Sequence, residues 1–187
     1  MQPTDQERST YYQHRESERL EFRPVEKEDI ALWTPFFEDE VALSHVGMLS
    51  GKFKTMTNAE RSTAWLERQM ERQNTGSLGQ LSVVEKATGK FIGVGGIILR
   101  GEEGVEDEWE VAYSLLPESR GKGFATEIAI HFRDWAFENT RVKSVISLVH
   151  VNNEASQRVT EKNGMHIDRN MIFFEMPVRV NRVFREV

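Results

Sequence analysis

The sequence predicts a mixed α/β (α+β) fold in a single domain. Short apolar or alternating runs, typical of strands, are interspersed with amphipathic segments that have helical periodicity, and turn residues separate them. From residue 20 onward the predicted order is β-α-α-β-β-β-α-β-α-β-β. A chain of 187 residues is long enough for one domain with a full hydrophobic core and too short for two ordinary ones.

The N-terminal part has three predicted segments. Residues 1–19 are polar and charged, so we expect an arm that is mobile or a short helix that orders against a partner. Residues 20–25 alternate in polarity and predict a first strand. Residues 27–37 have an apolar face and predict a helix, although Pro35 lies near its end.

The middle of the chain predicts a helix followed by a hairpin. Asn58 is the expected N-cap of the second helix, which ends near residues 74–76. Residues 81–85 and 91–99 are apolar and β-branched, as in strands, and residues 87–90 (Ala-Thr-Gly-Lys) are the turn between them.

The C-terminal half continues the alternation. Residues 109–116 predict a strand that ends at Pro117. A long amphipathic helix begins at Phe124. Residues 144–151 predict a further strand, residues 153–162 a short helix, and residues 172–180 the last strand assigned to the sequence.

The composition excludes several classes of protein. Charged residues make up 29% and hydrophobic ones 39%, and the longest apolar stretch is far shorter than a membrane span. The polar N-terminus does not resemble a secretory signal, so we expect a cytoplasmic protein without a membrane partner. There is no cysteine, which excludes a cysteinyl-acyl intermediate, and the five histidines lack metal-ligand spacing. A net charge of -6 argues against nucleic acid as a partner.

The most informative segment is the basic, glycine-containing loop Arg120-Gly121-Lys122-Gly123 that precedes the long helix. The first N–H groups of a helix have no intrahelical partners and lie at the positive end of its dipole, so they favour an anion. The glycines allow positive φ and a close approach of the backbone. The loop therefore predicts a site for a phosphate-bearing cofactor.

Two common nucleotide patterns do not fit this loop. A Walker loop requires G-x-x-x-x-G-K-[ST], but Lys122 is followed by Gly123. A dinucleotide fingerprint requires a third glycine, and Thr126 stands at that position.

Residues 120–125 do match the [QR]-x-x-G-x-[GA] pyrophosphate loop of the GNAT (Gcn5-related) N-acetyltransferases. Residues 110–113 (Glu-Val-Ala-Tyr) resemble the E-[IL]-G-Y strand of the RimJ/RimL-like branch, with Ala112 in place of glycine. Residues 153–156 and 161–165 resemble the N-x-x-S…E-K-x-G-[FM] segment of that branch. The order and separations are those of the family, and the resemblance covers most of the chain from about residue 20.

This resemblance implies a single GNAT domain at residues 20–187 whose mostly antiparallel central sheet is flanked by helices and splays after the fourth strand. The cofactor would be acetyl-CoA, with its pantetheine in the gap. The reaction would be direct transfer of acetyl to a primary amine in a ternary complex. The acceptor would be a protein N-terminus or a small amine, shaped by residues 27–73.

The resemblance also implies a set of cofactor-binding residues. Asn153 resembles the family asparagine that bonds the pantetheine, and its alternative role is a helix N-cap. The amide of Leu115 corresponds to an oxyanion donor. The full cofactor set is Leu115, Arg120, Gly121, Lys122, Gly123, Phe124, Ala125 and Asn153.

For catalysis, Glu110 is the candidate base, directly or through water, and its alternative is a solvated strand carboxylate. Many family members have a tyrosine acid seven residues after the motif asparagine, where this chain has Thr160. The branch suggests the hydroxyl of Ser156 instead, with capping or packing as the alternative. Tyr113 is expected to pack against the cofactor or the core.

Two questions stay open at this stage. The acidic residues between 102 and 108 form either an electrostatic funnel for a cationic amine or a solvated hairpin loop. The alternative to an enzyme is a CoA-binding sensor or scaffold module without transfer activity. The sequence also leaves the oligomeric state open, with a homodimer as one option.

Overall fold

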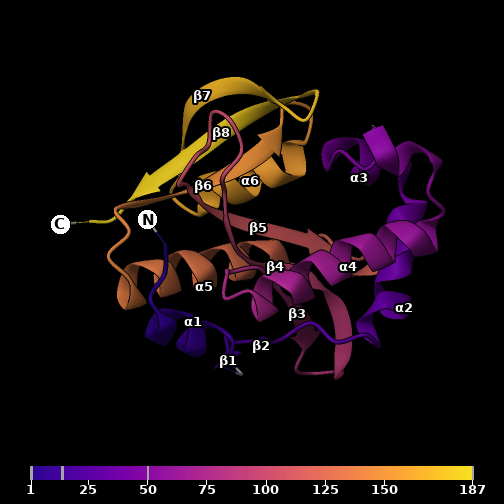
Figure 1. The fold of residues 1–187 in the computed structure, drawn as a ribbon, viewed down its shortest axis with the longest axis horizontal. Coiled ribbons are helices and arrows are strands. Elements are labelled where there is room, and N and C mark those ends of the chain that lie inside the picture. Colours follow the sequence, from indigo (N-terminus) through magenta and orange to yellow (C-terminus); the bar gives the residue numbers. More distant parts are fainter. Residues whose placement is uncertain (1, 14, 50, 187) are drawn as a thin grey trace.

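The computed structural model describes residues 2–13, 15–49 and 51–186. Its centre is one eight-stranded sheet with the strand order β1-β2-β3-β4-β5-β6-β8-β7 (Figure 1). The strands are β1 (Arg15–Glu16), β2 (Leu20–Arg23), β3 (Gln80–Glu85), β4 (Lys90–Leu99), β5 (Trp109–Leu115), β6 (Ser144–His150), β7 (His166–Phe173) and β8 (Met176–Phe184).

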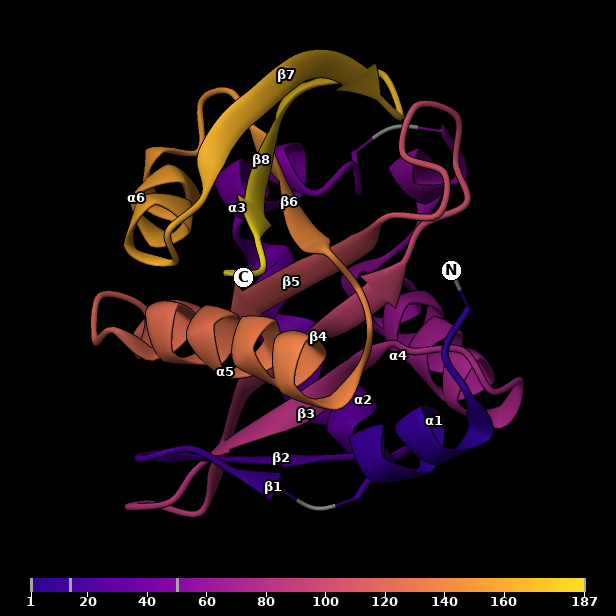
Figure 2. The ribbon, with the colours of Figure 1, turned by 90° about the vertical axis from the view of Figure 1, so that its left-hand side faces the viewer.

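Helices cover both faces of the sheet. Helices α5 and α6 lie on one face, and α2, α3 and α4 lie on the other (Figures 1 and 2). The helices are α1 (Asp5–Tyr11), α2 (Asp29–Trp33), α3 (Glu40–His45), α4 (Asn58–Asn74), α5 (Phe124–Asn139) and α6 (Glu154–Lys162), with 3-10 turns η1 (Thr34–Glu38), η2 (Gly51–Thr55) and η3 (Pro117–Ser119).

The sheet splays between β5 and β6. All other neighbouring strands pair antiparallel, but these two are parallel and register only at Glu110 and Ile146. The Ser147 hydroxyl donates to the Val111 carbonyl at 2.7 Å, which closes the narrow end of the gap. The mixed α/β fold with a mostly antiparallel, splayed sheet is therefore confirmed.

Two hydrophobic cores hold the helices on the sheet. Phe132, Ile128 and Trp135 of α5 are buried against the strands on one face. Trp33 of α2 and Leu66 of α4 belong to a second core on the other face. Burial of each such side chain stabilises the fold by roughly 1.5–3 kcal/mol. These two cores hold the helices on the two faces of the sheet.

Most predicted elements are present, but the two early helices differ. The helix expected over residues 27–37 is divided into α2 and η1, because Pro35 has no N–H to continue the α-helical ladder. The N-cap of α4 is Thr57 and not Asn58, and Thr57 and Glu60 form a reciprocal capping box.

The predicted order ends in two strands, as the structure does, but the bounds predicted for the last one, residues 172–180, are wrong. β7 ends at Phe173, and β8 begins at Met176. Phe174 and Glu175 form the two-residue turn with φ of +44° and +65°. This left-handed conformation is typical of tight hairpins, where glycine or asparagine is usual, and neither residue gives a turn signal.

The N-terminal segment contains a short helix, one of the two alternatives expected there, and this helix packs against the core of the same chain. Its helix α1 begins at a Thr4 capping box and ends with Tyr11, which is fully buried among Phe132 and Trp135. The Tyr11 hydroxyl donates to the Gly79 carbonyl at 2.6 Å and accepts from the Ile97 amide at 2.7 Å. Tyr11 of α1 thus completes the core beside α5 through contacts within the same chain.

We predict that Tyr11→Phe lowers the free energy of unfolding by about 1–3 kcal/mol, because a buried carbonyl and a buried amide lose their partner. Urea denaturation measures this change. Tyr12→Phe is the matched control, since the Tyr12 hydroxyl bonds the half-buried Ser77 carbonyl at 2.9 Å, and its effect should be smaller. Equal stabilities for Tyr11→Phe and wild type would contradict the prediction.

Candidate functional site

A cavity of about 800 Å³ occupies the gap between β5 and β6. It extends from the start of α5 to the neighbourhood of Glu110, so the predicted anion loop and the predicted base lie along one space. Lys122 lines a separate neighbouring pocket. The other predicted site residues all line the cavity: Glu110, Leu115, Arg120, Gly121, Gly123, Phe124, Ala125, Asn153 and Ser156.

The backbone at the start of α5 is arranged to accept an anion. Gly123 is the N-cap and has no side chain to bond the first amides of the helix, while its carbonyl accepts from Glu127. The amides of residues 124–126 therefore have no intrahelical partners. Gly121 and Gly123 have φ of +76° and +84°, which explains glycine at both positions.

The two basic side chains of the loop do different things. Arg120 forms an ion pair with Asp39, and its Nε donates to the Leu115 carbonyl at 3.0 Å. A hydrogen bond from Arg120 lowers the pKa of Asp39. Arg120 thus fixes the loop against the start of α3 and against β5, while the exposed Lys122 adds a positive charge at the surface of the loop.

Arg19, which precedes β2, holds the loop from the N-terminal side. Its guanidinium donates to Glu127 at 2.8 Å and to the Lys122 carbonyl at 3.0 Å, and it lies over the Phe124 ring at 4.7 Å. The Ser17 hydroxyl donates to the same Glu127 at 2.6 Å. Two segments about 100 residues apart in the chain are joined at the anion loop in this way.

At the start of α6, Asn153 acts as the N-cap. Its side-chain oxygen accepts from the amide of Ser156 at 3.1 Å, which agrees with the capping alternative, and Asn153 also lines the cavity. The hydroxyl of Tyr113 donates to the Ser156 carbonyl at 3.3 Å. Burial raises the pKa of Tyr113. Thr160 is buried and donates to the Gln157 carbonyl, so it does not replace the missing tyrosine.

Glu110 lies at the narrow end of the gap and is only 4% exposed. Its Oε2 accepts from Arg100 Nε at 2.5 Å, and the Leu148 amide approaches its Oε1 at 3.4 Å. Arg100 also pairs with Glu102 at 3.2 Å. Glu110 is therefore a fixed and paired carboxylate, in contrast to the solvated alternative, and its Oε1 is the less occupied oxygen.

Two of the five acidic residues before β5 form ion pairs with arginines. Glu102 pairs with Arg100 and Glu108 pairs with Arg182 at 2.5 Å. Burial raises the pKa of Glu102, but the Arg100 charge and hydrogen bonds outweigh it and lower the pKa overall. The run thus contributes two ion pairs to the hairpin, while Glu103, Glu106 and Asp107 remain exposed to solvent.

Sequence reasoning missed several residues of this site. Arg19 and Asp39 give no local signal, because their roles depend on contacts with residues that are far away in the sequence. Arg100 is adjacent to the acidic run, and its position opposite Glu110 follows only from the β4–β5 register, in which Ile98 faces Glu110. Trp65 is half-buried and lines the cavity.

Metal and membrane features were searched over the described ranges. There the structure has no group of three or more histidine, aspartate or glutamate side chains placed to hold a metal ion. The same ranges contain no helix with the length and apolar character needed to cross a bilayer.

Comparison with known proteins agrees with the geometry. The acetyltransferase (GNAT) domain model matches residues 19–166, and the chain belongs to this family. It is 26% identical over 165 residues to the uncharacterized protein YkkB of Bacillus subtilis (strain 168), covering 88% of this chain and 91% of that protein.

Two solved structures share the fold. One is RimL, a ribosomal L7/L12 alpha-N-protein acetyltransferase in complex with coenzyme A, with a TM-score of 0.70, 15% identity, and coverage of 90% of this chain and 95% of that one. The other is spermidine N-acetyltransferase from Vibrio cholerae in complex with CoA and spermine, with a TM-score of 0.69, 16% identity, and coverage of 90% and 96%.

We predict that Arg19→Met loosens the start of α5. The variant loses the Glu127 pair and the bond to the Lys122 carbonyl, so amide hydrogen exchange at residues 127–130 should become several-fold faster. Arg169→Met is the control, because Arg169 pairs with Asp168 on β7, away from the loop. Unchanged exchange at residues 127–130 in Arg19→Met would show that Arg19 does not stabilise the start of α5.

Proposed function

We propose that this protein is an acetyl-CoA-dependent N-acetyltransferase that transfers acetyl to a primary amine. The observation that supports this most strongly is the continuity of the cavity, which joins an anion-binding helix start to a buried carboxylate across splayed strands. Acetyl transfer to amines is the general reaction of the family to which the chain belongs. Placement in the RimJ/RimL-like branch, a cytoplasmic location and a homodimer stay predictions.

The residues present fit a CoA thioester. Free amides at residues 124–126, with glycines at 121 and 123, suit a pyrophosphate, and the exposed Lys122 adds positive charge. The gap between β5 and β6 offers strand edges for a pantetheine, and Asn153 lines the same wall. When bound, acetyl-CoA supplies an acyl group that is already activated for attack by a neutral amine.

The protein's own groups would then orient the amine and manage its proton. We assign Glu110 as the base, with Oε1 as the accepting atom because Arg100 occupies Oε2. The Leu115 amide is the proposed oxyanion donor. Ser156 is the proposed proton donor to the leaving thiolate. The absence of cysteine agrees with direct attack.

Lys122→Glu should weaken the binding of acetyl-CoA roughly tenfold, since it replaces an attractive charge beside the pyrophosphate site with a repulsive one. Isothermal calorimetry measures the dissociation constant. Lys143→Glu, an exposed charge reversal just before β6, is the matched control and should bind like wild type. A substitution at Gly123 is less informative, because its positive φ strains any side chain. Failure of the folded wild type to bind acetyl-CoA would overturn the proposed function.

Glu110→Gln should lower kcat about 10²–10⁴-fold with the best amine found in a screen, and leave the affinity for acetyl-CoA unchanged. Detection of the CoA thiol released from acetyl-CoA gives the rate. The change also weakens a buried pair with Arg100, so the thermal stability of the variant must be measured alongside its activity. Glu103→Gln, on the exposed part of the same hairpin, is the control. Full activity in Glu110→Gln would remove this carboxylate from the mechanism.

A CoA-binding module without transfer activity is the second candidate. The observation in its favour is that Glu110 is engaged by Arg100 and that Thr160 stands where many family members have a tyrosine. Tight binding of acetyl-CoA together with no CoA release in a broad amine screen would favour it over the enzyme.

A further inference from the structure

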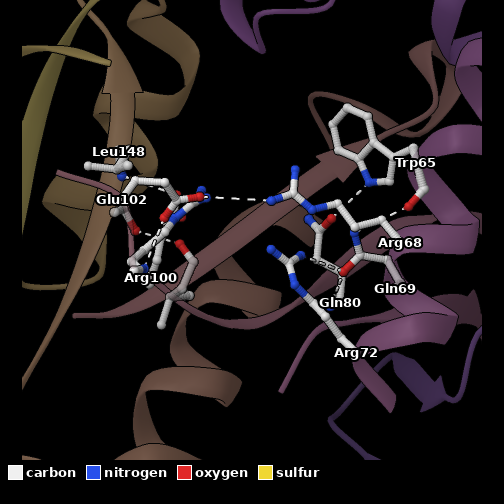
Figure 3. Close-up of polar contacts among 12 residues, drawn as sticks. Trp65, Arg68, Gln69, Arg72, Gln80, Arg100, Glu102 and Leu148 are labelled. Atoms are coloured by element: carbon white, nitrogen blue, oxygen red, sulfur yellow. Dashed lines mark hydrogen bonds and ion pairs between the residues drawn. The ribbon is translucent and has the colours of Figure 1, made fainter. Parts of the chain in front are cut away.

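Helix α4 has one largely polar face beside the end of the cavity at Glu110, and Trp65 of this face lines the cavity itself. Trp65, Arg68, Gln69 and Arg72 follow the i, i+3, i+4, i+7 spacing that places side chains on one side of a helix. Figure 3 shows the guanidinium groups of Arg68 and Arg72 directed into the same gap, opposite Arg100 and Glu102.

A chain of polar contacts links this face to the candidate base. Arg68 and Arg100 share one oxygen of Glu102, at 3.9 Å and 3.2 Å (Figure 3). Arg100 in turn pairs with Glu110, which is bonded to the amide of Leu148 at the start of the splay. A group bound beside Arg68 would therefore lie next to the site of amine activation.

The neutral side chains around the arginines are fixed. The Gln69 oxygen accepts from the Gln80 amide at 3.0 Å and from Arg72 at 3.1 Å. Trp65 donates its indole N–H to the Gln80 side chain at 2.9 Å. Arg72 is thus held in place by a neutral amide, and this contact does not neutralise its positive charge.

The charges of the cluster do not balance. Three guanidinium groups, those of Arg68, Arg72 and Arg100, meet the two carboxylates of Glu102 and Glu110. Burial, together with the charges of Arg68 and Arg100, lowers the pKa of Arg72 to about 10. Arg68 remains 54% exposed, and its contact with Glu102 is long. A bound anion would neutralise the excess positive charge of the cluster, whereas a bound cation would increase it.

We propose that the acceptor is a primary amine that also carries an anionic group, a carboxylate or a phosphate, and that Arg68 and Arg72 bind this anion while the amine reaches Glu110. The inference rests on the N-acetyltransferase function proposed above and names its substrate class. Arginine suits the task because its planar fork binds carboxylate and phosphate oxygens in pairs.

Matched amines test the proposal. β-Alanine is compared with β-alaninamide, phosphoethanolamine with ethanolamine, and putrescine serves as the cationic amine. We expect at least one anionic amine to exceed its neutral partner by roughly tenfold or more in kcat/KM, the effect of a charge-assisted hydrogen bond. The pair that shows the difference distinguishes a carboxylate from a phosphate.

Variants locate the effect. Arg68→Gln and Arg72→Gln should each remove most of this preference and leave the dissociation constant of acetyl-CoA unchanged, while Arg68→Lys should restore part of it. Arg141→Gln, at an exposed position after α5, is the control. Circular dichroism melting verifies that the variants are folded.

Two results would overturn the inference. If neutral or cationic amines react as well as the anionic ones and the arginine variants do not change the ratio, the inference fails and the N-acetyltransferase function stands. If no amine reacts, that function fails. Calorimetry with β-alanine and phosphoethanolamine on CoA-saturated protein then tests whether the arginines bind an anion. Binding that Arg68→Gln weakens would support the anion site, and absence of binding would overturn it.

Discussion

The structure depends on one contact, the single parallel register between Glu110 of β5 and Ile146 of β6. The two strands pair only at this point, and where they separate the cavity lies between them. The Ser147 hydroxyl bonds the Val111 carbonyl just past this point, so the narrow end of the gap is closed by a side chain. A longer ladder between β5 and β6 would fill the space that a pantetheine needs. The same strand pair therefore sets both the fold and the location of the proposed chemistry.

Separating two strands inside a sheet leaves backbone groups without ladder partners, which is costly in a buried place. The fold limits this cost from outside the gap. β6 pairs with β8 over its whole length, and β5 pairs with β4 over its whole length. Independent cores on the two faces then hold the halves of the sheet in position, and the arginine pairs of Arg120 and Arg19 fix the loop at the wide end.

The sequence predicted those parts of the structure whose causes are local. The positive-φ glycines at 121 and 123, followed by an amphipathic run, determine where α5 begins, and the turn at residues 87–90 determines a hairpin. Elements set by distant contacts were not predictable in the same way. Tyr11 looks like part of a polar arm until α5 is placed beside it, and the Phe174–Glu175 turn has no turn residue. The identity of the candidate base could be predicted from a motif, but its pairing with Arg100, just after β4, could not.

The two ends of the cavity use positive charge differently. At the end of the cavity near α5, ion pairs with Asp39 and Glu127 neutralise the charges of Arg120 and Arg19. Backbone amides and the exposed Lys122 are then the groups that could bind an anion there. Such arginines shape a loop and are poor markers of a ligand. At the other end, the α4 face has more guanidinium groups than nearby carboxylates, and the surplus is held in place by neutral amides. An arginine indicates an anionic ligand when its charge is not already balanced by the fold. By that criterion, Arg68 and Arg72 support an anionic partner at the proposed acceptor site, beside the Glu110 end of the cavity.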